Sequence, residues 1–325
     1  MKAAGKAAGL PALLLAVGLA ASVSLALAGC DNGDGEEGGG NTLPTAKGVN
    51  ALSGKTYFDY SEKIAFSATA EGAANGTFTI GSAVWKDGAN NWELENGKYK
   101  YFPSKTGYYS WDATAKTVTI SPEKIANRNN GVYGPLETKA AYRAAVQKML
   151  DDYKKERGEA WLNEQLASMG FSSVAAYLDY AVAEDFKNVI YNYAFSADNK
   201  ALFLDEPLPA SKGANELTGL TFNGTRDGND DVKDDSQTYV FTATGCTETG
   251  EGGYSQTYTY TYNSSEKMVY LKTPTEDRDA RYNADNTNSG YFDSADAYNA
   301  AQVNNQYNRL EKYKYDTAKK LLQRR

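Results

Sequence analysis

The chain contains no histidine and only two cysteines. Without histidine, neither a Ser-His-Asp nor a Cys-His catalytic centre can form, and no imidazole can ligate a metal ion. Any enzyme built on this sequence would depend on carboxylate, lysine or tyrosine side chains. A carboxylate-dependent hydrolase is one alternative, but nothing in the spacing of the acidic residues selects a catalytic pair. We therefore expect a protein that is not an enzyme, with no cofactor and no bound metal.

The first thirty residues are typical of a secretion signal. Lys2 and Lys6 precede a run of apolar and small residues that ends in Leu27-Ala28-Gly29-Cys30. A transmembrane helix is the alternative, but the run lacks aromatic or basic anchors at its far end. The Leu-Ala-Gly-Cys motif resembles the lipobox of bacterial lipoproteins. The resemblance implies that the Cys30 thiol receives a diacylglycerol and that residues 1–29 are removed.

Lipidation at Cys30 implies a membrane partner and an extracytoplasmic location, on the outer membrane or the cell surface. Each buried acyl methylene contributes about 0.8 kcal/mol, so two or three acyl chains form a stable anchor. Asp31 implies inner-membrane retention under the enterobacterial sorting rule, which other bacterial groups do not follow. The choice of membrane therefore stays open. With Cys30 lipidated, Cys246 has no cysteine to pair with, so an intrachain disulfide is excluded.

Positive charge is also scarce. The formal net charge is −7, and removal of residues 1–29 takes away two lysines and no acid, which gives −9. A nucleic-acid partner would require a basic surface that displaces counterions from phosphates. We therefore expect no nucleic-acid partner.

Tyrosine, by contrast, is abundant, at 25 residues. Residues 30–50 are rich in glycine and acid and predict a flexible tether between the lipid and the folded part. Short alternating segments follow from Leu52 and indicate antiparallel strands. Asn96-Gly97 suits a two-residue type I′ turn, because both positions of that turn need positive φ. The predicted cross-strand pairs, in order from this turn, are 95–98, 94–99, 93–100 and 92–101, with charged pairs on a wet face and apolar pairs on a dry one.

A second type of hairpin occurs three times, at residues 109–120, 193–204 and 260–271. In each copy an aromatic, x, aromatic triplet leads through a polar turn with a lysine to an apolar, x, apolar strand. Constant spacing keeps such alternating faces in register. Wider likenesses relate residues 52–57 to 217–222, 66–69 to 241–244 and 141–145 to 297–301. The chain is therefore predicted to be a tandem duplication.

Helical spacing of apolar residues at 142–153, 161–169 and 174–182 predicts three helices, and a further helix is predicted from about Ser294 to Leu322. We therefore expect an α+β fold with antiparallel, meandering β units in tandem, a helical insertion and a C-terminal helix. The expected divisions are a signal peptide (1–29), a tether (30–50), a β unit (51–213) with the insertion at about 137–190, and a second β unit with the C-terminal helix (214–325).

With a lipobox, an acidic tether and hairpins that carry aromatic triplets, the chain resembles the lipocalin-like surface lipoproteins of spirochaetes. The resemblance covers residues 52–204 and 217–271 at the level of pattern, and it implies β-barrel units. The chain departs from an ordinary lipocalin in its helical insertion. Its second unit also shows too few strand patterns for an independent barrel.

Candidate ligand-binding residues are aromatic. Tyr258, Tyr260 and Tyr262 alternate with threonine and place a stripe of rings on one strand face. Such a stripe either packs in a core or lines a ligand cavity or docking surface. The same two interpretations apply to Trp85, Trp92, Tyr101 and Trp111.

The densest acidic run lies at residues 227–235. A calcium loop of the EF-hand type needs glycine and glutamate where this run and its continuation have Val232 and Thr238. We therefore interpret the run as a solvated loop, with a weak Ca²⁺ site as the alternative.

Together these features predict a non-catalytic, membrane-anchored lipoprotein. Its aromatic-rich β units would bind a small ligand or a protein of the envelope or of a host. The alternative is a structural or assembly role in the cell envelope, with the helices between Thr138 and Val189 as a docking surface.

Overall fold

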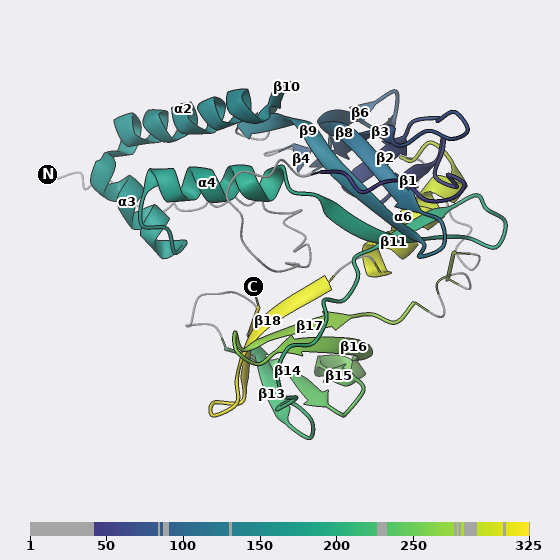
Figure 1. Ribbon diagram of the computed structural model, residues 1–325. Coiled ribbons are helices and arrows are strands. Elements are labelled where there is room, and N and C mark those ends of the chain that lie inside the picture. Colours follow the sequence, from purple (N-terminus) through teal and green to yellow (C-terminus); the bar gives the residue numbers. More distant parts are fainter. Residues whose placement is uncertain are drawn as a thin grey trace, which may run out of the picture.

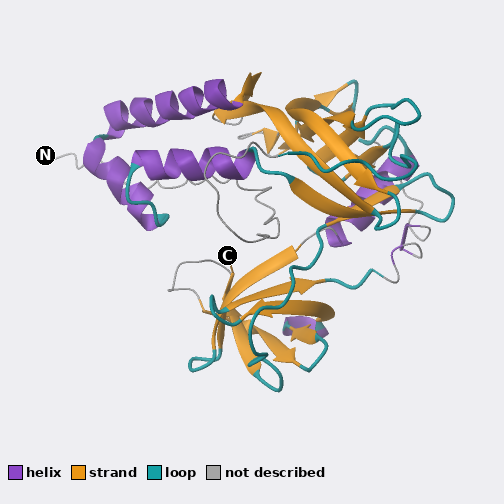
Figure 2. Ribbon diagram, viewed as in Figure 1, coloured by secondary structure: helices purple, strands orange, loops and turns teal. Residues whose placement is uncertain are grey.

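The computed structural model describes residues 42–83, 85–86, 91–129, 132–225, 233–275, 278, 281–282, 291–307 and 310–324. Two β units and a projecting helical arm make up the molecule (Figure 1), and strands dominate it (Figure 2). The α+β class with barrel-type sheets is thus confirmed. Among the described helices, none combines the length and the hydropathy that a membrane span requires.

The first β unit is an antiparallel sheet whose strands are neighbours in chain order. Its path runs through β1 (Thr56–Phe58), β2 (Glu62–Phe66), β3 (Gly76–Ala83), β8 (Tyr101–Asp112), β9 (Thr117–Asn129), β11 (Val189–Phe195) and β12 (Leu202–Asp205). A further strand, β10 (Val132–Thr138), pairs with β9 off this path. The sheet curls until β1 lies beside β12. It is therefore nearly a barrel.

Side chains alternate between the inside and the outside of this sheet, because successive strand residues point to opposite faces. On β2, Ile64 and Phe66 are buried and Ala65 between them is exposed. Inward residues from every strand of the path meet in one core, which includes Tyr109, Trp111 and Tyr193. Each such side chain contributes about 1.5–3 kcal/mol through its burial.

Between β3 and β8 the chain forms two short ladders. These are β4 (Trp85–Lys86) with β5 (Asn91–Trp92), and β6 (Leu94–Glu95) with β7 (Lys98–Tyr99). The predicted type I′ turn is confirmed, since Asn96 and Gly97 have φ angles of 52° and 79°. The Lys100 ammonium lies 3.1 Å from the Glu93 carboxylate, so the predicted charge pair is confirmed as well.

The last predicted pair of this hairpin is wrong. Trp92 pairs with Trp85, and Tyr101 has already joined β8 opposite Ala83. The predicted dry face is wrong too, because Leu94 is 42% exposed. Two residue pairs are too short a ladder to hold the strands together beyond the turn, so each strand continues with another partner.

The second β unit is a closed barrel. Its strands are β13 (Thr221–Thr225), β14 (Lys233–Phe241), β15 (Cys246–Thr249), β16 (Ser255–Asn263), β17 (Met268–Lys272), β18 (Leu310–Asp316) and β19 (Leu321–Arg324), with a short 3-10 turn η1 (Glu251–Gly253) before β16. Neighbouring strands are antiparallel except for β13 and β19, whose parallel pairing sets Asn223 opposite Leu321 and closes the barrel. The expectation of too few strands for an independent barrel is therefore wrong.

The predicted C-terminal helix is wrong beyond its middle. The helix α6 spans Ala295–Tyr307, and the chain then forms the β18–β19 hairpin. Tyr313 and Tyr315 both reach the barrel core. A helix could not bury both rings on one face, because residues two apart lie on different sides of a helix, whereas they share one face of a strand.

The two units share one strand order, so that β1 corresponds to β13 and β12 to β19. They also share the hydrogen bonds of an asparagine, Asn50 or Asn215, that anchors the segment before the first strand. Residues 43–54 recur as residues 208–219, with Leu-Pro-x-x-Lys-Gly-x-Asn-x-Leu-x-Gly in both. In the first copy Asn50 donates to the Tyr109 hydroxyl, and in the second Asn215 donates to the Tyr260 hydroxyl, both at 2.9 Å. The segment at residues 42–50 therefore lies on the first β unit as residues 207–215 lie on the second.

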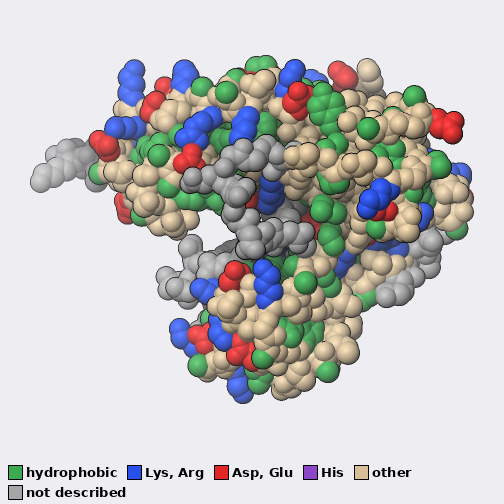
Figure 3. Space-filling view, in the orientation of Figure 1, with side chains coloured by type: hydrophobic (Ala, Val, Ile, Leu, Met, Phe, Trp, Pro, Cys, Tyr) green, Lys and Arg blue, Asp and Glu red, His purple; other side chains and the backbone are tan. Residues whose placement is uncertain are grey.

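Each unit carries its helices at the same place in the strand order. The helices α2 (Lys139–Arg157), α3 (Glu159–Ser168) and α4 (Val174–Asp185) lie between β10 and β11, project from the sheet as an arm (Figure 1) and have a core of their own. Lysine and arginine side chains stand along the upper edge of this arm (Figure 3). In the second unit α6 occupies the corresponding place, between β17 and β18, but it packs against β1 and β12 of the first unit.

Buried charges join the two units. Asp205, at the end of β12, accepts hydrogen bonds from Lys272 of β17 and, at 3.0 Å, from Arg278. These three side chains are 10% exposed or less. The adjacent Glu206 is 2% exposed, and neither of its carboxylate oxygens has a hydrogen-bond partner among the described residues.

Candidate functional site

The aromatic residues singled out in the sequence are distributed over both units. Trp111 lies in the first core, 5% exposed, and its indole N–H donates to a backbone carbonyl 3.0 Å away. The Tyr101 hydroxyl is buried and has no hydrogen-bond partner among the residues that the structure describes, and the Lys63 ammonium lies 4.8 Å from the centroid of the Tyr101 ring. Trp85 and Trp92 pair across β4 and β5, and their side chains lie outside the described part of the structure.

Tyr258, Tyr260 and Tyr262 share the inner face of β16. Tyr258 is 5% exposed and donates to the Glu248 carboxylate at 2.7 Å. Tyr260 and Tyr262 are partly buried against the second core. The Tyr260 hydroxyl donates to the Thr242 carbonyl at 2.8 Å. These rings thus contribute to the packing of the barrel.

The remaining sequence candidates lie partly outside the described residues. Cys30 does, and of the acidic run at 227–235 only the first residues of β14 are described. Cys246 is 1% exposed, and burial raises the pKa of its thiol to about 12, so the thiol stays protonated and unreactive. Within the described ranges, histidine, cysteine, aspartate and glutamate form no group of three that could hold a metal ion.

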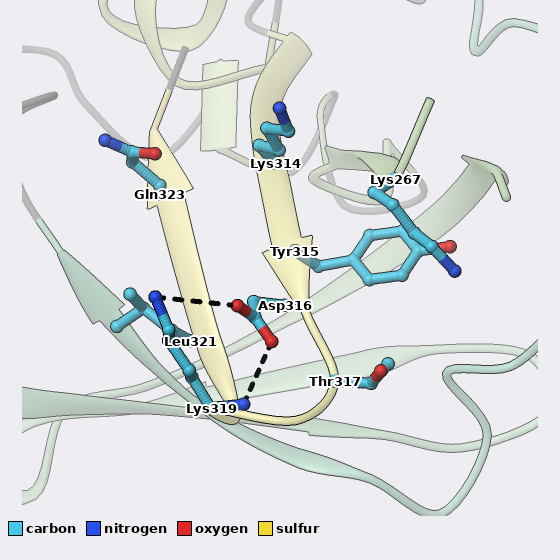
Figure 4. A pocket seen from close by; sticks show the side chains of 8 residues that line it. All are labelled: Lys267, Lys314, Tyr315, Asp316, Thr317, Lys319, Leu321 and Gln323. Carbon is cyan, nitrogen blue, oxygen red and sulfur yellow. Dashed lines mark hydrogen bonds and ion pairs between the residues drawn. The ribbon is translucent and has the colours of Figure 1, made fainter. Parts of the chain in front are cut away.

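A groove of about 360 Å³ lies at the C-terminal hairpin (Figure 4). Its walls come from the turn before β17, from β18 and from β19. The lining residues are Lys267, Lys314, Tyr315, Asp316, Thr317, Lys319, Leu321 and Gln323. Side chains of both charge signs gather at this end of the second barrel (Figure 3).

The local sequence explains the shape of the hairpin. The Asp316 carboxylate accepts hydrogen bonds from the backbone N–H groups of Ala318 and Lys319, at 3.0 and 2.9 Å, and so holds the turn. Lys320 completes the turn with a φ of 50°. The strand register then places four lining side chains on the outer face of the hairpin, in the pairs Lys314–Gln323 and Asp316–Leu321.

Three ammonium groups and one carboxylate give the groove a net positive charge. Lys319 lies 3.9 Å from Asp316, and Lys267 donates to Glu216 at the edge of the groove. The Tyr315 hydroxyl donates to the same Glu216 oxygen at 2.7 Å. The hydrogen bonds from Lys267 and then from Tyr315 lower the pKa of Glu216, which is therefore ionised at neutral pH.

Lys314 is the ammonium group that the protein itself leaves available. Its side chain is exposed, and no carboxylate of the described residues lies within ion-pair distance of it. An ammonium group binds phosphate or carboxylate oxygens through charge-assisted hydrogen bonds. The amide of Gln323, directly opposite on β19, can donate to the same anion. The groove is thus suited to a small anionic group.

Sequence reasoning missed this site, although a signal for it exists. Residues 313–323 repeat the aromatic triplet, the polar turn with a lysine and the apolar strand of the three hairpins that the sequence predicted. The backbone repeats as well, since Lys116, Lys267 and Lys320 have φ angles of 56°, 57° and 50° at the same place in their turns. The segment is therefore a fourth copy of the hairpin.

No protein-family model, curated protein or solved structure matches the chain. The groove's own geometry therefore indicates its chemistry. That geometry offers positive charge, hydrogen-bond donors and the apolar Leu321 side chain on an open surface.

Proposed function

We propose that the protein is a non-catalytic, lipid-anchored lipoprotein that binds an anionic ligand outside the cytoplasm through the groove of the C-terminal hairpin. The observation that carries this proposal is the gathering of three lysines around one groove in a chain of net charge −7. Glu216 and Asp316 neutralise two of these lysines, so the exposed Lys314 ammonium is the group that an anionic ligand would bind. The ligand carries a phosphate or a carboxylate group.

The proposal includes a lipocalin-like architecture. Its support is the meandering order of neighbouring strands in both units. Aromatic and aliphatic side chains of the chain itself occupy the two cores. We therefore assign the ligand to the outer face of the second barrel rather than to its interior.

Anchoring depends on Cys30. Thr42 is the first described residue, and its carbonyl accepts a hydrogen bond of 3.5 Å from Asn188, next to the start of β11. The twelve residues from Cys30 to Thr42 span at most about 40 Å when fully extended. The lipid would therefore hold the folded units close to the bilayer.

Removing the acylated thiol tests the anchor. We expect the Cys30→Ala variant to leave the membrane fraction, because the acyl chains supply the affinity for the bilayer. Fractionation of cells followed by an immunoblot measures this. A variant that stays with the membranes through a high-salt wash would contradict lipid anchoring at Cys30.

The groove is tested with the full mature chain in detergent, titrated with inorganic phosphate and, separately, with glucuronate at constant ionic strength. We expect saturable binding of at least one probe, and about 5- to 10-fold weaker binding by Lys314→Gln, because a charge-assisted hydrogen bond is lost. The matched control is Lys148→Gln on α2, an exposed lysine paired with Asp152. Equal losses in both variants, or no saturable binding of either probe, would refute the groove as the site.

A second candidate function is a structural or assembly role in the envelope, and the helical arm favours it. The arm has its own core and carries two exposed apolar side chains, Met169 at 38% and Tyr180 at 44%. Crosslinking in intact cells tests this role. We expect the native chain to give a defined protein adduct that the Tyr180→Asp variant does not give. A native chain that gives no adduct would refute the structural role, and if that chain binds phosphate, the ligand-binding role would be the one that stands.

A further inference from the structure

Equivalent places in the two units can be compared residue by residue. In the second unit the turn residue Lys267 accepts, at its carbonyl, a hydrogen bond of 2.8 Å from the N–H of Tyr315. In the first unit Lys116 accepts a bond of the same length from Tyr193. The ammonium groups also match, since each lysine lies over the ring of its tyrosine, 5.6 Å from the centroid of Tyr315 and 5.7 Å from that of Tyr193.

The second unit supplies a carboxylate to this lysine–tyrosine pair. Glu216 follows the anchoring residue Asn215, and one of its oxygens accepts hydrogen bonds from both Lys267 and Tyr315. The Tyr315 hydroxyl contact measures 2.7 Å. One carboxylate thus satisfies a hydroxyl and an ammonium group together.

The first unit has the same pair without the carboxylate. The residue after Asn50 is Ala51, which carries no polar group, where the second unit has Glu216. The Tyr193 side chain is 3% exposed, and its hydroxyl has no hydrogen-bond partner among the described residues. A buried hydroxyl without a partner is unfavourable, so a ligand that supplied an acceptor would recover free energy.

We propose that Lys116 and Tyr193 form a binding site for the carboxylate of a small external acid, in the place that Glu216 fills in the second unit. Both donors of the second unit's triad are present, and only the acceptor is missing. Ala51 and Lys116 are exposed, so the lysine side chain can move aside to admit the acid. The site lies on the other β unit from the groove, and it does not depend on the function proposed for the groove.

The charges around the site favour an anion. Lys55 lies over the neighbouring Phe195 ring, 5.6 Å from its centroid. The nearest acidic group, Asp112, is held by Lys47 at 3.1 Å and by the N–H groups of its own turn, so it is not an acceptor for Tyr193. Two ammonium groups therefore lie over rings of β11, Lys116 over Tyr193 and Lys55 over Phe195, and Lys55 also donates to the Asn199 carbonyl at 3.2 Å.

The experiment uses the full mature chain in detergent with tyrosine labelled at the carbon that bears the hydroxyl. Acetate is the probe, acetamide is the neutral control, and ionic strength is constant. Nuclear magnetic resonance follows the Tyr193 and Tyr315 signals, assigned with Tyr193→Phe and Tyr315→Phe. We expect acetate to move the Tyr193 signal saturably and to leave Tyr315 in place. Lys116→Gln should weaken acetate binding about 10-fold.

Two exchanges between the units provide matched variants. Ala51→Glu should move the Tyr193 signal without acetate and abolish its response to acetate, because the chain then supplies its own acceptor. Glu216→Ala should make the Tyr315 signal respond to acetate, which shows that the assay detects an emptied site of this type. A Tyr193 signal that acetate leaves unmoved, or that Ala51→Glu leaves unmoved, overturns the proposal.

Discussion

At the scale of single residues, tyrosine hydroxyls hold the charged interior of the second barrel together. Glu248 is 4% exposed, and its oxygens accept hydrogen bonds from Tyr239 at 3.0 Å, Tyr258 at 2.7 Å and Tyr254 at 3.5 Å. A buried carboxylate without such donors would lose several kcal/mol of solvation. The abundance of tyrosine is therefore partly explained by this network, which needs a ring that packs and a hydroxyl that donates.

We predict that Tyr258→Phe lowers the free energy of unfolding by about 1.5–3 kcal/mol, because it removes the shortest hydrogen bond to a buried charge. Urea denaturation measures this change. The control is Tyr254→Phe, since Tyr254 is 48% exposed and its contact is the longest. A loss of about 0.5 kcal/mol or less is expected there, and equal losses in the two variants would argue against the network.

At the scale of elements, α6 covers the open seam of the first sheet. Asn304 is 1% exposed, and its side-chain amide donates to the Phe58 carbonyl of β1 at 2.8 Å and to the Leu202 carbonyl of β12 at 3.2 Å. Side chains of α6 also pack with Phe203 of β12 and with Ala201, which precedes that strand. The Asn304 amide thus donates to carbonyls of the two edge strands, which in a closed barrel would accept hydrogen bonds from each other's backbone N–H groups.

We predict that Asn304→Ala destabilises the first unit by about 1–3 kcal/mol, because it removes one buried and one half-buried hydrogen bond to backbone carbonyls. Hydrogen exchange of the amides of β1 and β12 should rise more than that of β16. The control is Asn163→Ala on α3, an exposed asparagine, for which about 0.5 kcal/mol or less is expected. Uniform loss of protection over both units would contradict a local role at the seam.

The sequence predicted those elements whose signals are local. The Asn96-Gly97 turn was predictable because its two φ requirements restrict the residue types, and the three hairpins because their spacing is constant. The C-terminal hairpin was missed because Tyr307, Leu310, Tyr313 and Leu321 also fit a poor helical stripe. The parallel closure of β13 on β19 depends on the barrel as a whole, and no local pattern encodes it.

The candidate sites were predictable to a smaller extent. The groove depends on which face of the hairpin each lysine takes, and this follows only once residues 310–324 are assigned to strands. The Lys116–Tyr193 site depends on the lack of a carboxylate at Ala51. This lack is noticed only when residues 43–54 are aligned with residues 208–219, where Glu216 occupies the matching position. Conversely, the sequence alone could not decide whether Trp111 and Tyr258 pack in a core or contact a ligand, because both environments favour aromatic rings.

At the scale of the whole molecule, the two units meet at a cluster of buried ionisable side chains, in which Asp205 pairs with Lys272 and Arg278 and Glu206 lies next in the chain. Burial raises the pKa of Glu206 to about 7, although the nearby Lys312, Lys272 and Lys187 lower it. The neutral acid is therefore the form that the folded state prefers. This contribution to stability is fully present below the unfolded pKa, near 4.5, and is lost as the pH rises through about 7.

We predict that Glu206→Gln stabilises the protein relative to the native chain more at pH 8 than at pH 5, by up to about 3 kcal/mol, because glutamine stays neutral throughout. Urea unfolding at the two pH values measures the difference. The exposed Glu123→Gln is the control and should give the same difference at both pH values. A Glu206→Gln effect that does not change with pH would contradict the assignment.

The position of α6 also determines the order in which the molecule can be completed. The first sheet begins at residue 56, but the helix that covers its seam ends at residue 307, after most of the second barrel. A growing chain that emerges from its N-terminus onward can therefore form much of the first unit early but cannot cover its seam until nearly the entire chain has appeared. The first unit waits for residue 307 and the second for its last strand, which ends at residue 324, so two units whose synthesis begins far apart are completed almost together.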